Sequence, residues 1–138
     1  MVNVLIVSAD ADYRDIYTLG LRHAGFGTRS AERCDHVPDI VRTFRVDAIT
    51  LHMDRDTEAA WTECRSLIEI AHPAPVVLLT SWIFPDARNA RMAFEIGCAA
   101  FVMEPCVPGD LADVIERVVA GERNVEWPVT RITMVDDG

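Results

Sequence analysis

The sequence contains no lysine: all thirteen of its basic residues are arginines. Chemistry that needs a side-chain amine is thereby excluded, including Schiff-base catalysis and phosphate binding by a P-loop lysine. The G-x-G-x-x-G pattern of dinucleotide binding and the G-x-S-x-G pattern of hydrolases are also missing. The sequence therefore favours a protein that is not an enzyme.

Long apolar runs and positive charge are scarce as well. No window approaches the ~18 uninterrupted apolar residues of a membrane-spanning helix, and the first residues lack the basic start of a signal peptide. We therefore expect a cytoplasmic protein with no membrane partner. The net charge of −9 and the pI near 4.7 count against direct nucleic-acid binding, because phosphate contacts need a basic surface.

The cysteine pattern gives no sign of a metal centre. None of the four cysteines forms a C-x-x-C pair or the paired Cys/His spacing of a zinc site. We expect free thiols that pack as small hydrophobic groups, and no cofactor. The four are Cys34, Cys64, Cys98 and Cys106.

Apolar strands alternate with amphipathic helices along the 138 residues. Continuous apolar runs such as VNVLIV and VVLLT are typical of strands that are covered on both faces. Between them, apolar or small residues recur at helical spacing, as do Ile16, Leu19, Gly20 and Ala24 in the first helix. Strands are predicted at 2–7, 26–30, 48–51, 76–80 and 101–103, and helices at 12–24, 35–45, 57–71, 86–96 and 108–120.

This alternation predicts an α/β fold with a doubly wound, parallel, five-stranded sheet of the flavodoxin type. Residues 1–121 would form one domain, and residues 122–138 a C-terminal tail or linker without clear periodicity. In such a fold the loops at the carboxyl ends of the strands form the functional crevice. His52, which ends the third apolar run, belongs to that edge of the sheet.

Four segments, in order, resemble the receiver domain of bacterial response regulators, the CheY-like proteins of two-component signal transduction and phosphorelays. The resemblance covers roughly residues 3 to 121 and supports the predicted fold. It rests on the first strand with its turn, the strand that presents the phosphoacceptor, the fourth strand and the approach to the last helix. These read VLIVSADADYRD, VDAITLH, PVVLLTS and AFEIGCAAFVMEPCVPGDL.

The chemistry of that family does not carry over residue by residue. Receivers phosphorylate an aspartate, bind magnesium with an acidic pair and neutralise the phosphoryl group with a lysine. Here Ser8 and Ala9 stand at the acidic pair, so that only the following Asp10 remains. His52 stands at the phosphoacceptor position and Glu104 at the lysine. We therefore expect magnesium binding to be lost, and the domain to be a pseudo-receiver.

The conformational switch of the family is partly kept. Thr80 retains the switch hydroxyl, whereas Phe101 replaces the switch aromatic, which is usually tyrosine. The resemblance also predicts a cis Glu104–Pro105 bond that turns residue 104 back into the pocket, within reach of His52.

His52 and Glu104 reverse the usual polarity of the pocket and leave several interpretations open. An ion pair between them would favour the imidazolium form and a pH- or ligand-sensitive latch. The simpler alternative is a neutral histidine, held by one hydrogen bond, that locks the pocket in one state. A metal site with Asp54 or Asp10, and a phosphohistidine at His52, are weaker interpretations of the same residues.

The resulting prediction is a phosphorylation-independent receiver that acts as a protein-interaction or regulatory module. Its partner would be another protein or a second copy, bound through the face of the fourth helix, fifth strand and fifth helix. Trp82, Ile83 and Phe84 are candidate interface residues, or else a lid over the pocket. The alternative function is a small-ligand, metal or pH-sensing switch that uses the altered pocket.

Overall fold

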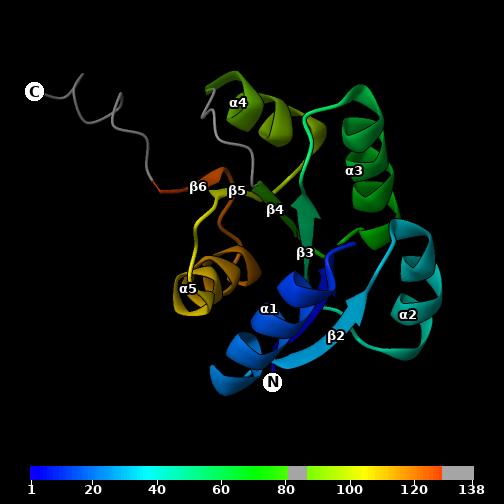
Figure 1. Cartoon of the computed structure of the whole chain (residues 1–138), viewed down its shortest axis with the longest axis vertical. Coiled ribbons are helices and arrows are strands. Elements are labelled where there is room, and N and C mark those ends of the chain that lie inside the picture. Colours follow the sequence, from blue (N-terminus) through cyan, green and yellow to red (C-terminus); the bar gives the residue numbers. More distant parts are fainter. Residues whose placement is uncertain (81–86, 129–138) are drawn as a thin grey trace, which may run out of the picture.

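The structure is a computed structural model that describes residues 1–80 and 87–128 (Figure 1). Within these residues, none of the helices is long and apolar enough to cross a bilayer. The strands are β1 (Asn3–Val7), β2 (Gly27–Ala31), β3 (Ala48–Met53), β4 (Val76–Thr80), β5 (Ala100–Met103) and β6 (Val125–Trp127). The helices are α1 (Ala11–His23), η1 (Cys34–His36), α2 (Val37–Thr43), α3 (Glu58–Ala71), α4 (Ala87–Ile96) and α5 (Pro108–Val119).

The strands form one parallel sheet in the order β2-β1-β3-β4-β5-β6, which confirms the doubly wound α/β prediction. Side chains alternate between the two faces of each strand. In β1, Val4 and Ile6 pack in the cluster that includes α1 and α5, while Leu5 and Val7 pack in the cluster that includes α3. Figure 1 shows α1 and α5 together on one side of the sheet.

The sheet has six strands, one more than the sequence predicted. β6 pairs in parallel with β5, with Ala100 opposite Val125 and Val102 opposite Trp127, so β5 lies inside the sheet instead of at its edge. Part of the segment predicted as a tail is therefore a strand. The signal was weak because β6 has only three residues, too few to show a period of two.

Helix α1 faces the sheet with a different stripe from the one that its aliphatic residues indicate. Ile16 and Leu19 are 58% and 68% exposed, so they do not belong to the core. The helix instead buries residues at i, i+4 and i+8, because two aromatic rings remove more apolar area from water than the aliphatic pair does. These buried residues are Tyr13, Tyr17 and Leu21.

Helices α1 and α5 approach each other closely at one point. A Cβ atom built on Gly20 would lie 2.3 Å from Cβ of Pro108, the first residue of α5. Such a distance is well inside van der Waals contact, so only glycine fits there without displacement of the proline ring. Gly20 thus fixes how deeply α5 packs against α1.

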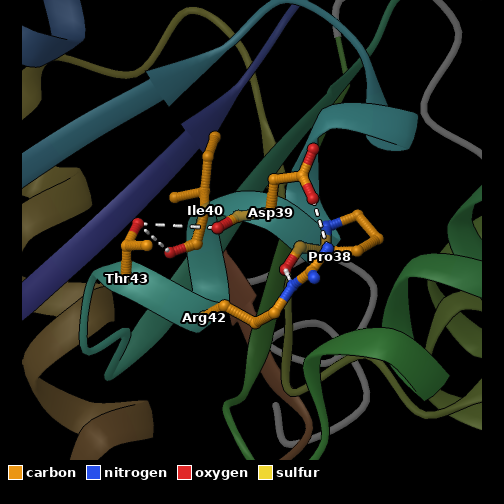
Figure 2. A network of polar contacts seen from close by, with 5 residues as sticks. All are labelled: Pro38, Asp39, Ile40, Arg42 and Thr43. Carbon is orange, nitrogen blue, oxygen red and sulfur yellow. Dashed lines mark hydrogen bonds and ion pairs between the residues drawn. The ribbon is translucent and has the colours of Figure 1, made fainter.

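Helix α2 is shorter than the predicted 35–45 because its first turn is the separate 3₁₀ helix η1. Its exposed side makes local contacts, which Figure 2 shows. Arg42 bonds the carboxylate of Asp39, and its Nε donates to the Pro38 carbonyl over 3.3 Å. The Thr43 hydroxyl donates to the Ile40 carbonyl over 3.4 Å. These contacts stay within one helix and stabilise it locally.

Candidate functional site

The site lies where β1, β3 and β5 end. Ser8 follows β1, His52 is the fifth residue of β3, and Glu104 follows β5. Alternation along each strand places all three side chains on the face covered by α1 and α5. The Glu104–Pro105 bond is cis, as predicted. The structure therefore brings together three of the residues that the sequence predicted to form one pocket.

His52 is held by one hydrogen bond to Ser8. Its Nδ1 lies 2.9 Å from the Ser8 hydroxyl, which also accepts the backbone N–H of Asp10 over 3.1 Å. The hydroxyl has one proton, which it can donate to Nδ1, and in that arrangement the ring proton is on Nε2. Asp10 in turn caps α1, accepting from the backbone N–H groups of Asp12 and Tyr13 over 2.9 and 3.2 Å.

Tyr13 covers the imidazole. The two rings are stacked, with centroids 4.0 Å apart and an interplanar angle of 3°. The hydroxyl of Tyr13 is buried and has no hydrogen-bond partner. The hydroxyl of Tyr17, one helical turn further on, donates to the Cys106 carbonyl. Sequence reasoning missed Tyr13. The available signal was an aromatic residue three positions after the Asp10 cap, on the turn that faces the sheet.

His52 and Glu104 are close but do not form a hydrogen bond. Nε2 of His52 lies 3.6 Å from Oε1 of Glu104, and both atoms are buried without a hydrogen-bond partner. Burial lowers the pKa of His52, an effect that Asp54 and Asp10 only partly offset. Burial also raises the pKa of Glu104, and Asp10 raises it further. Both pKa shifts favour the uncharged forms of these two side chains.

A pocket of about 250 Å³ opens beside the imidazole. Its lining contains three carboxyl groups, and His52 is the one basic side chain among the described residues that line it. In the described part of the chain, no group of three or more His, Cys, Asp or Glu side chains is placed to hold a metal ion. The lining residues are Ala9, Asp10, Tyr13, His52, Asp54 and Glu104.

The two predicted switch residues lie apart from this pocket. Thr80 pairs with Met53, so alternation directs its side chain to the face opposite His52, where its hydroxyl is buried without a partner. Phe101 is 2% exposed and packs in the same opposite-face cluster. The candidate interface residues Trp82, Ile83 and Phe84 lie outside the described residues, so that prediction stays open.

No family model matches the sequence, and no curated protein matches it either. Solved structures do match. A response regulator from Thermotoga maritima is 14% identical, with a TM-score of 0.76, over 88% of this chain and 99% of that one. This chain has the receiver fold.

Two further structures agree. A CheY-like response regulator receiver domain protein from Methanospirillum hungatei is 15% identical, with a TM-score of 0.72, over 87% of this chain and 94% of that one. The chemotaxis protein CheY4 from Vibrio cholerae is 18% identical, with a TM-score of 0.71, over 86% and 98%. At these identities the likeness establishes the fold, and the site has to be argued from its own residues.

Proposed function

We propose that the chain is an atypical receiver domain, not an enzyme, that works without phosphorylation as a protein-interaction module in signal transduction. One observation carries the proposal: at the edge where receivers place an aspartate opposite a lysine, this chain has His52 facing Glu104 at 3.6 Å. The fold supplies the scaffold, and the exchanged pair removes the phosphoryl chemistry.

A phosphoryl group at this edge would be poorly stabilised. Three carboxyl groups, those of Asp10, Asp54 and Glu104, line the pocket, and His52 is the one described lining residue that could carry a positive charge. Like charges in a partly buried site repel strongly, and phosphoryl transfer depends on cationic stabilisation. Magnesium, which could offset this repulsion, prefers several oxygen ligands, and Ala9 offers only a methyl group.

The contacts of His52 support a pocket with one resting state. The Ser8 hydroxyl is hydrogen-bonded to Nδ1 of His52, and the ring of Tyr13 stacks on the imidazole. A histidine that is stacked, hydrogen-bonded and almost fully buried has few alternative rotamers. Such a module would signal by being bound or released, since its pocket has no phosphorylated state to adopt.

The partner surface is proposed to be the face of α4, β5 and α5. In this chain β6 lies along the outer edge of β5, so the face presents β6 between the two helices. A protein partner, or a second copy, would then contact β6 and the flanking helices, and the β5 backbone is already paired.

The decisive experiment is incubation of the purified chain with acetyl phosphate and magnesium, followed by intact-mass measurement. We expect no added phosphate. A variant carrying Ser8→Asp, Ala9→Asp, His52→Asp and Glu104→Lys restores the receiver residue types and serves as the matched control, in which we expect phosphorylation. A phosphate on the unmodified chain, mapped to His52 or Asp54, would refute the proposal.

A further inference from the structure

The pocket beside His52 has more hydrogen-bond acceptors than donors. Asp10, Asp54 and Glu104 contribute carboxyl oxygens, while the ring N–H of His52 is the donor directed at Glu104. Arg14, the basic residue of the first turns of α1, is not in the pocket lining, and its Nη1 donates to the Ser8 carbonyl over 2.6 Å. The charge of the pocket is thus left without compensation by its own lining.

A second observation is independent of the acidic groups. The side chain of His52 is only 9% exposed and lines the pocket, yet its Nε2 has no hydrogen-bond partner and lies 3.6 Å from Oε1 of Glu104. Oε1 of Glu104 is likewise buried and unpartnered. Buried polar atoms without partners cost free energy, and where they border a pocket they mark contacts that a ligand can complete.

The size of the pocket decides between kinds of cation. About 250 Å³ is several times the ~30 Å³ that one water occupies. A bare metal ion needs ligands that converge within ~2.6 Å of one point, and the described residues offer no such group of three. An extended cation that donates several hydrogen bonds fits both the volume and the acceptors.

We propose that this pocket binds a guanidinium or ammonium group. The cation lies between the carboxylates of Asp10, Asp54 and Glu104. The positive charge of the ligand stabilises the ionised form of Glu104. The Glu104 carboxylate then moves closer to His52 than the present 3.6 Å and accepts a hydrogen bond from Nε2–H. The bound cation occupies the region where receivers place their own lysine, a residue type that this chain lacks entirely.

The test uses the unmodified chain and N-acetyl-arginine methylamide, with the citrulline analogue as the neutral probe of the same shape. The ring resonances of His52 report binding by NMR, and those of His36 and His72, which are not in the pocket lining, serve as internal references. We expect a saturable shift of His52 with the arginine probe and none with citrulline.

Two pocket variants and one matched control locate the site. Glu104→Gln and Asp54→Asn should each weaken binding about tenfold, the loss expected for one charge-assisted hydrogen bond. Glu69→Gln removes the same charge from the exposed side of α3, outside the pocket lining, and should leave binding unchanged. Asp54 is exposed, so its variant stays informative if the Glu104 variant does not fold.

The same titration distinguishes the sources of the cation. Tighter binding of an arginine- or lysine-containing peptide than of the single amino-acid probe assigns the cation to a protein partner. Tighter binding of spermidine assigns it to a free polyamine.

Three results would overturn the proposal. They are no saturable shift with any cationic probe, equal shifts with citrulline, and a saturable shift with inorganic phosphate or magnesium alone. The first two leave the phosphodonor experiment, and with it the proposed function, unaffected.

Discussion

The two faces of the sheet treat buried polar groups differently. On the face of α1 and α5, polar groups gather in the interconnected set of Ser8, His52 and Tyr13. On the opposite face the core is mostly apolar, and two buried thiols, those of Cys64 and Cys98, lie 3.6 Å apart. Among the described residues, four of the five buried side-chain atoms without a hydrogen-bond partner lie on the face of α1 and α5, the exception being the Thr80 hydroxyl, and a functional site is expected where such atoms gather.

The largest effect should come from the apolar face. Leu78 is fully buried in β4, so Leu78→Ala removes transfer free energy and leaves a cavity, which should cost about 2–5 kcal/mol of unfolding free energy. Leu19→Ala is the matched control, because Leu19 is 68% exposed and its loss should change stability by less than ~0.5 kcal/mol. Urea denaturation measures both. Equal effects of the two variants would mean that α1 packs with another stripe.

The packing of the other face can be broken at Gly20. Gly20→Ala places a methyl group 2.3 Å from Cβ of Pro108 and should cost about 1–3 kcal/mol. Gly109→Ala, in the first turn of α5, meets no atom within 4 Å and should stabilise by up to ~1 kcal/mol, because alanine favours helix. Thermal unfolding compares the two. A neutral Gly20→Ala would show that α5 can move away from α1 without cost.

The two buried tyrosines of α1 allow a finer test of the polar face. Tyr17→Phe removes the hydrogen bond to the Cys106 carbonyl and should cost about 1 kcal/mol. Tyr13→Phe removes a buried hydroxyl that has no partner, so it should be neutral or stabilising. Denaturation of both variants under the same conditions gives the comparison. A loss of stability in Tyr13→Phe would reveal a partner for that hydroxyl.

The sequence was sufficient for the fold but not for the details of its edges. Strands such as β1 and β4 are continuous apolar runs, and their pattern depends on burial alone, which a sequence expresses directly. By contrast, β6 depends on pairing with β5, and three residues carry no period. The side of α1 that packs on the sheet depends on which side chains bury more area once β1 and β5 are in place, so the aliphatic pattern gave the wrong stripe.

The site was predictable in position but not in state. His52, Ser8 and Glu104 follow apolar runs at one sheet edge, and topology brings them together. The charge of His52 could not be predicted, because it depends on burial by Tyr13, a residue that the strand pattern does not connect with the site. For Thr80 the sequence predicted the position at the end of a strand but not the face of the sheet. Its pairing with Met53 places its side chain on the face opposite His52.

The smallest effect concerns pH. Burial lowers the pKa of His52 in the folded chain, so between its ordinary value near 6.5 and the lowered value the unfolded chain binds more protons. Stability should therefore fall as the pH falls through this window and be unaffected by His52 above it.

For Glu104 burial raises the pKa, so above about 4.5 the folded chain holds a proton that the unfolded chain releases, and stability falls as the pH rises through that window. Replacing one group at a time separates the opposing slopes. His52→Gln should flatten the loss of stability below pH ~6.5, and Glu104→Gln should flatten the loss above pH ~4.5. Denaturant midpoints measured across this range give both slopes. If His52→Gln instead steepens the acid loss, the imidazolium is stabilised in the folded chain, and the pocket contains the ion pair after all.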